Sequence, residues 1–101
     1  QEILNIVKYH FKINFREESV FYYRFITHIK FFAQRLFSNT IHNGETDEEL
    51  LSIIKSKYSK EFECIIKIEN FIKKQYKYDL TDDEMIYLTI HIAKIVKDSK
   101  I

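Results

Sequence analysis

Apolar residues recur along this chain at intervals of three and four positions, the spacing that places them on one face of an α-helix. The repeat predicts helices over residues 2–12, 16–38, 47–57, 60–77 and 81–97. The second segment follows the rule over four turns, with apolar residues at Phe25, Ile29, Phe32 and Leu36. The pattern therefore predicts an all-α fold built from five helices.

Polar residues mark where several of these helices begin. Ser, Thr or Asn followed three residues later by Glu is typical of a capping box, in which each side chain accepts a hydrogen bond from the other residue's backbone N–H. Pairs with this spacing are Asn14 and Glu17, Thr46 and Glu49, and Thr81 and Glu84. They predict the starts of the second, third and fifth helices. The segment 38–45 contains the only Gly and is the clearest predicted loop.

Composition supports this fold and limits the size of the unit. A chain of 101 residues is large enough for one hydrophobic core and too small for two, so we expect a single domain over residues 1–101. One Gly and no Pro leave few turns for a β architecture. The chain opens on Gln1, already inside an amphipathic segment, and we expect it to be a piece of a longer regulator.

Charge and cysteine content restrict the possible partners and the compartment. The formal net charge of +1 supplies no broad field for holding nucleic acid. Lysines and tyrosines alternate over residues 73–78, a pattern that can bind single-stranded nucleic acid. The lysines also continue a polar stripe along the helix, so a solvent-exposed helix face is the favoured interpretation.

Cys64 is the only cysteine, so a small buried thiol in a reducing cytoplasm is expected. No apolar run approaches the roughly 20 residues of a membrane span, and no membrane insertion is expected.

Two histidines stand inside strongly apolar helical segments, His28 in the second and His91 in the fifth. Imidazole titrates near neutral pH and is nucleophilic when neutral, so it suits phosphoryl, proton or metal chemistry. The simpler interpretation is a core histidine with one satisfied nitrogen. The two segments look alike, and this similarity favours a shared chemical role.

Metal binding and catalysis find little support around these histidines. A helical metal site needs a second ligand three or four residues away, and none of those positions near His28 or His91 holds one. A two-helix site with a distant carboxylate remains an alternative. The chain also lacks a Gly-rich phosphate loop, a nucleophile elbow and a carboxylate dyad. We therefore expect a protein that is not an enzyme and needs neither a metal nor another cofactor.

Phosphoryl acceptance fits the neighbouring residues better. Arg24 lies one turn before His28 and Arg35 two turns after it, so all three share one side of the helix. A phosphohistidine carries close to two negative charges, and guanidinium groups pair with phosphate through two hydrogen bonds. Near His91, a hydroxyl and an ammonium group are supplied by Tyr87 and Lys94. The alternative is that these cations only solvate the helix surface.

The two histidine segments resemble the motifs of a known regulatory family. Residues 24–35, RFITHIKFFAQR, resemble the first histidine motif of the PTS regulation domain (PRD), and residues 81–92, TDDEMIYLTIHI, resemble the second. The intervening helix is similar at Tyr58, Phe62, Cys64 and Ile65. The resemblance covers nearly the whole chain. Among the tandem copies in BglG/LicT-type transcription antiterminators, residues 31–35 look most like the second copy.

This resemblance implies a compact five-helix bundle that pairs as a homodimer. It also implies reversible phosphorylation of His28 and His91 by the histidine phosphocarrier HPr or by a sugar-specific enzyme II component. The output would be control of an attached N-terminal RNA-binding domain, outside this sequence, that prevents early termination at sugar-utilisation operons.

Other classes remain as alternatives at this stage. The parent protein is either an antiterminator or a DNA-binding transcription activator that carries the same domain. A helical oligomerisation or RNA-contacting module with structural histidines is the competing hypothesis from another class. A small metalloenzyme is the third.

Overall fold

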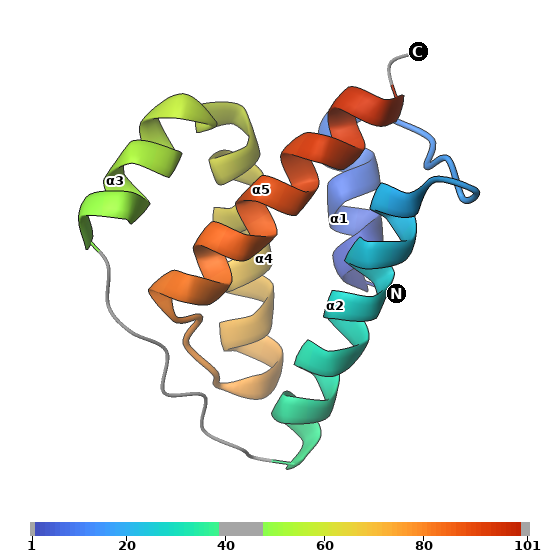
Figure 1. The fold of residues 1–101 in the computed structure, drawn as a ribbon. Helices are drawn as coiled ribbons and strands as arrows, with labels where there is room; N and C mark the ends of the chain where they lie inside the picture. The colour runs from blue at the N-terminus through green and yellow to red at the C-terminus, as the bar shows by residue number, and fades with distance from the viewer. Residues whose placement is uncertain (1, 39–47, 100–101) are drawn as a thin grey trace.

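The computed structural model describes residues 2–38 and 48–99, and all regular structure within them is helical (Figure 1). The helices are α1 (Glu2–Phe11), α2 (Val20–Ser38), α3 (Glu48–Lys57), α4 (Ser59–Tyr76) and α5 (Asp82–Ser99). The prediction of an all-α, five-helix fold is confirmed. The bounds of α1, α3, α4 and α5 lie close to the predicted ones.

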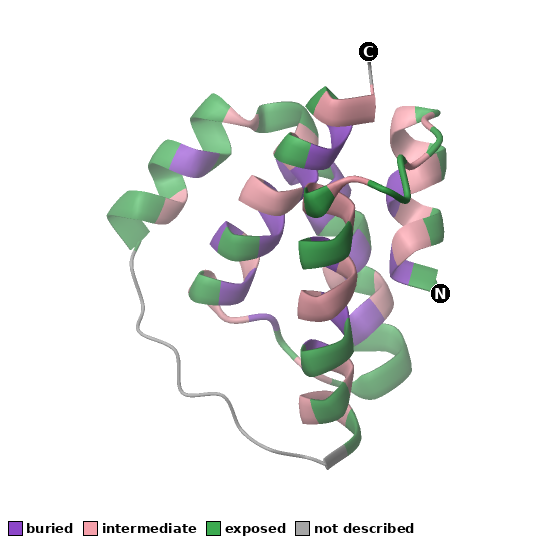
Figure 2. Ribbon diagram, turned by 45° about the vertical axis from the view of Figure 1, so that its right-hand side comes forward, coloured by how far each residue is buried: buried purple, intermediate pink, exposed green. Residues whose placement is uncertain are grey.

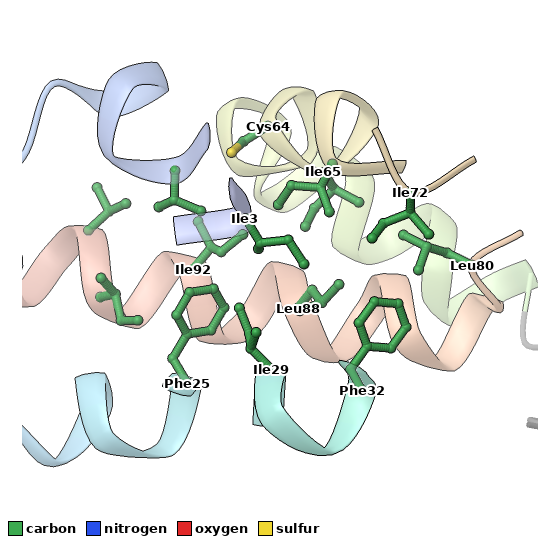
Figure 3. Packing of buried hydrophobic residues seen from close by; sticks show 14 residues of the cluster. Ile3, Phe25, Ile29, Phe32, Cys64, Ile65, Ile72, Leu80, Leu88 and Ile92 are labelled. Carbon is green, nitrogen blue, oxygen red and sulfur yellow. The ribbon is translucent and has the colours of Figure 1, made fainter. Parts of the chain in front are cut away.

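Helix α5 crosses the middle of the bundle and packs against α2, α3 and α4, while α1 packs against α4 (Figure 1). Figure 3 shows Phe25, Ile29 and Phe32 extending from α2 into the core shared with α4 and α5. These three side chains are buried as their spacing predicts, and Leu36 is only partly buried. Burying each of these side chains contributes about 1.5–3 kcal/mol, which holds α2 against α4 and α5.

The start of α2 differs from the prediction. The helix begins at Val20, and its cap is Ser19, whose hydroxyl oxygen accepts a hydrogen bond from the Phe21 N–H at 3.1 Å. The prediction that Asn14 and Glu17 cap a helix starting near residue 16 is therefore wrong. The serine is favoured because its side chain reaches the second N–H of the helix, one of the donors that have no partner within the first turn.

The capping box at the start of α5 is confirmed. The Glu84 N–H donates to the Thr81 Oγ1 at 3.1 Å, and the Thr81 N–H donates to the Glu84 Oε1 at 2.9 Å. The other predicted capping box pairs Thr46 with Glu49. Thr46 lies outside the described residues, as does most of the predicted loop.

Two helices end through residues in the left-handed conformation. Lys12, after α1, has a φ of 55°, and the Ile13 N–H donates to the Lys8 carbonyl at 3.1 Å. Lys77, after α4, has a φ of 53°, and its N–H donates to the Lys73 carbonyl at 3.0 Å. Both positions use a conformation that glycine adopts at lower cost, because a Cβ crowds the following carbonyl oxygen.

Burial is uneven across the bundle (Figure 2). Helix α3 buries Ile54 alone and is mostly exposed, whereas α4 buries residues along much of its length. Cys64 is fully buried, as predicted, and burial raises the pKa of its thiol to about 12. Within the described ranges, no helix combines the length and the apolar character needed to cross a bilayer.

Candidate functional site

His28 of α2 and His91 of α5 meet where these two helices pack. Their ring centroids are 5.8 Å apart, and the ring planes differ by 15°. The ring of Tyr87 stacks on both, with centroid distances of 4.0 Å to His28 and 4.1 Å to His91. Tyr87 and His91 share one face of α5 because they are four residues apart. The sequence predicted both histidines as acceptors but not that they stack.

The hydrogen bonding of the two imidazoles is different. The Nδ1 of His91 lies 2.9 Å from the carbonyl oxygen of Tyr87, one turn earlier in the same helix. That oxygen can only accept, so Nδ1 carries the hydrogen and Nε2 carries the free electron pair. The Nε2 of His28 is buried and has no hydrogen-bond partner among the residues that the structure describes.

Both imidazoles are neutral at physiological pH. The pKa of His28 is lowered to about 4, and burial is the largest cause. Positive charge on His91 and Arg35 adds to this change, and the Glu84 carboxylate opposes it. Burial also lowers the pKa of His91, with contributions from Lys94 and Arg24, although the hydrogen bond to the Tyr87 carbonyl opposes this change. A neutral imidazole retains the electron pair that a nucleophile needs.

A surface pocket lies beside His28, and Arg24, one of the cations that lower the pKa of His91, lines it. This pocket has a volume of about 240 Å³ and is lined by Tyr23, Arg24, Thr27, His28, Phe31 and Tyr87. Its aromatic members are well exposed, with 68% of Tyr23, 56% of Phe31 and 46% of Tyr87 accessible. Arg24 and Lys94 are exposed as well. A negatively charged group that entered here would meet positive potential and a partly apolar wall.

Arg35 lies on the other side of His28 and is held by a buried carboxylate. Its Nη2 is 3.0 Å from the Oε2 of Glu84, which is 3% exposed. Glu84 also accepts hydrogen bonds from the Tyr78 hydroxyl at 3.0 Å and from the Thr81 N–H at 2.9 Å. The pKa of Tyr78 is raised to about 12, with burial as the largest cause and the negative charge of Glu84 as the second. This network ties the C-terminal half of α2 to the first turn of α5.

All six residues that the sequence singled out lie around the contact between α2 and α5. His28, His91 and Tyr87 are in ring contact, Arg24 lines the pocket beside His28, and Arg35 and Lys94 act on the imidazoles through their charges. Sequence reasoning missed the ion pair of Glu84 with Arg35 and the exposed aromatic wall at Tyr23 and Phe31. The capping box did place Glu84 at the start of α5, but it carried no sign of a partner in α2.

Within residues 2–38 and 48–99, no group of three or more His, Cys, Asp or Glu side chains is arranged to hold a metal ion. Beside the two histidines lie the Tyr87 ring and cations, which are not ligands for a divalent metal.

Comparisons with known proteins agree with one another. The family model described as PRD domain matches residues 1–95. Transcription antiterminator LicT of Bacillus subtilis (strain 168) is 57% identical over 99 residues, which cover 98% of this chain and 35% of that protein. The beta-glucoside operon antiterminator of Dickeya chrysanthemi is 45% identical over 94% of this chain and 33% of its own length. Protein GlcT of Staphylococcus aureus (strain Newman) is 36% identical over 75% of this chain and 26% of its own length. The chain thus spans about a third of the length of these relatives, or less.

Proposed function

The chain belongs to the PRD domain family, and on that premise we propose that it is the phosphorylation-controlled regulatory part of a sugar-responsive transcription antiterminator. His28 and His91 accept phosphoryl groups, and the resulting charge shifts an association equilibrium that controls an attached RNA-binding domain. The chain acts as a switch and not as an enzyme, because it receives the phosphoryl group and turns over no substrate. The names of the relatives support antitermination as the output.

One observation carries this proposal: two neutral imidazoles stack beside one pocket while cations lie around them. Burial is the largest cause of the lowered pKa values, and it keeps both nucleophiles unprotonated before transfer. The neighbouring cations lower the pKa values further, and the same cations favour a bound phosphoryl group, since that group carries close to two negative charges.

Each cation has a specific role in the proposed product. Arg24 lines the pocket and acts on His91 from the neighbouring helix, so it can bridge the two acceptors. Lys94 adds positive charge on the His91 side, and Arg35 adds it on the His28 side. The Tyr87 hydroxyl supplies a hydrogen-bond donor at the pocket wall.

The phosphodonors in this proposal are the phosphocarrier HPr and a sugar-specific enzyme II component, which places the chain in the cytoplasm. The exposed rings of Tyr23, Phe31 and Tyr87 support a homodimer contact beside the acceptors, because clustered apolar surface of this kind marks interaction sites. A phosphoryl group added at the edge of that surface changes the charge of the contact and therefore the strength of association.

The direct test is phosphoryl transfer to the folded chain. Incubation with phosphoenolpyruvate, enzyme I and HPr should place acid-labile label on the parent chain and on each of the single variants His28→Ala and His91→Ala, and should leave the double variant unlabelled. His10→Gln is the matched control, since His10 lies on α1 away from this site. Absence of label on the folded parent chain, or undiminished label on the double variant, refutes the proposal.

A second measurement separates this function from a purely structural role for the histidines. If the histidines only stabilise the fold, His28→Asp and His91→Asp should melt at much lower temperature than the parent chain. If they are acceptors in a partly open site, these variants should fold and shift the monomer–dimer equilibrium in sedimentation experiments. Loss of folding in both variants, or folded variants whose association is unchanged, contradicts the regulatory role.

A further inference from the structure

Opposite ring nitrogens of the two imidazoles are engaged or buried. In His91 the Nδ1 is occupied by its hydrogen bond to the Tyr87 carbonyl, and in His28 the buried nitrogen is Nε2. Building on the proposed function, we propose that His91 accepts the phosphoryl group on Nε2 whereas His28 accepts it on Nδ1. The two acceptors of one bundle then form different phosphohistidine isomers.

For His91, the hydrogen bond fixes the reacting tautomer. The Nε2 electron pair attacks the phosphorus of a protein-bound phosphohistidine, an N–P bond forms, and the P–N bond of the donor breaks. The electron pair of the broken bond returns to the donor imidazole, and Nδ1–H stays on His91 throughout. The His91 ring becomes cationic, so its hydrogen bond to the Tyr87 carbonyl becomes charge-assisted and stronger. No base has to remove a proton in this step.

Transfer to the Nδ1 of His91 would have the opposite effect. It would break the 2.9 Å hydrogen bond and place a tetrahedral dianion against a carbonyl oxygen. The carbonyl carries partial negative charge and has no hydrogen to donate, so this isomer would be repelled.

For His28, burial selects the other nitrogen. A phosphoryl group on Nε2 would need space where packed side chains already surround the atom, and protein interiors leave no such space. The ring also lines the open pocket beside Arg24 and Phe31, which leaves Nδ1 as the nitrogen that a donor reaches. Transfer to Nδ1 follows the same electron balance, with Nε2 keeping its hydrogen. The Glu84 carboxylate offsets part of the repulsion that Arg35 exerts on the positively charged ring.

The isomers are read from chains that each retain one acceptor. We would label His28→Ala and His91→Ala chains with ¹⁵N-histidine, phosphorylate them with phosphoenolpyruvate, enzyme I and HPr, and record long-range ¹H–¹⁵N correlations. The chain that retains His91 should carry phosphorus on Nε2, and the chain that retains His28 should carry it on Nδ1. The preferred isomer should exceed the other by about tenfold or more, which corresponds to about 1.4 kcal/mol.

The unphosphorylated chain gives an independent reading. At pH 7.5 the same spectra should show the His91 ring as the tautomer with hydrogen on Nδ1. The opposite tautomer of His91, the same isomer at both histidines, or a mixture of isomers at either one would overturn the proposal of opposite nitrogens while leaving phosphorylation itself standing. Absence of phosphorus on both folded chains would overturn the proposed function as well.

Discussion

Replacing Glu84 with glutamine removes a buried negative charge while nearly keeping the size of the side chain. The carboxylate accepts hydrogen bonds from Arg35, Tyr78 and Thr81, and only 3% of its residue surface is exposed. A glutamine has only one acceptor oxygen. In place of the second carboxylate oxygen it has an NH₂ group, which faces a hydrogen-bond donor and cannot accept from it. At least one hydrogen bond to a charged group is therefore lost, and the Arg35 charge loses its partner.

The size of the effect follows from those contacts. A hydrogen bond to a charged group contributes roughly 1.5–3 kcal/mol, and breaking a fully buried ion pair costs about 3–5 kcal/mol. The Arg35 side chain is 25% exposed, so water compensates part of the loss. We expect Glu84→Gln to lower the free energy of unfolding by about 2 kcal/mol, which corresponds to a fall in Tm of roughly 10 °C for a domain of this size.

Urea unfolding followed by circular dichroism measures this change. Asp83→Asn is the matched control, because Asp83 is an exposed carboxylate in the same first turn and should lose only about 0.3–1 kcal/mol of interaction with the helix dipole. A double-mutant cycle with Arg35→Gln isolates the pair and should give a coupling of about 0.5–3 kcal/mol. Equal losses for Glu84→Gln and Asp83→Asn, or a coupling near zero, would refute the conclusion that this network stabilises the contact between α2 and α5.

Three further outcomes follow from other parts of the chain. Lys77→Gly should raise the free energy of unfolding by about 1 kcal/mol in urea melts, because residue 77 has a φ of 53°, whereas Lys74→Gly inside α4 should lower it by a similar amount. Ser19→Ala should cost about 1 kcal/mol while Asn14→Ala leaves stability unchanged, and the reverse result would restore Asn14 as the cap. His28 has a pKa of about 4 when folded against 6.5 as its ordinary value, so the unfolded chain binds more protons between these pH values. Stability should therefore fall as pH drops from 6.5 toward 4, and His28→Gln should weaken this dependence; an unchanged dependence would contradict the lowered pKa.

Helices were predictable from the sequence because their signals are local. The three-and-four spacing of apolar residues depends only on the helical period, and the Thr81–Glu84 box depends on atoms within one turn. The start of α2 was predicted wrongly for the same reason. Asn14, Glu17 and Ser19 are all acceptable near a helix start, and the sequence held no information on which of them the packed helix would use.

The candidate site was predictable in its residues but not in its arrangement. His28 and His91 could be singled out because each interrupts an apolar helical face, and Arg24, Arg35 and Lys94 because they lie within two turns. Their assembly depends on how α2 packs on α5. Arg35 and Glu84, for example, are 49 positions apart, and no spacing rule relates residues at that separation.

By itself, the sequence determined the helical segments, the apolar faces that drive them together and the identity of the two imidazoles with their neighbouring cations. Those properties come from single side chains and from contacts within one or two helical turns. Only the tertiary structure decided that His28 and His91 stack on Tyr87, that the pKa of each imidazole is lowered and that Glu84 holds Arg35. The physical reason is that burial and charge at a given atom are sums over every element packed around it, and those elements come from distant parts of the chain.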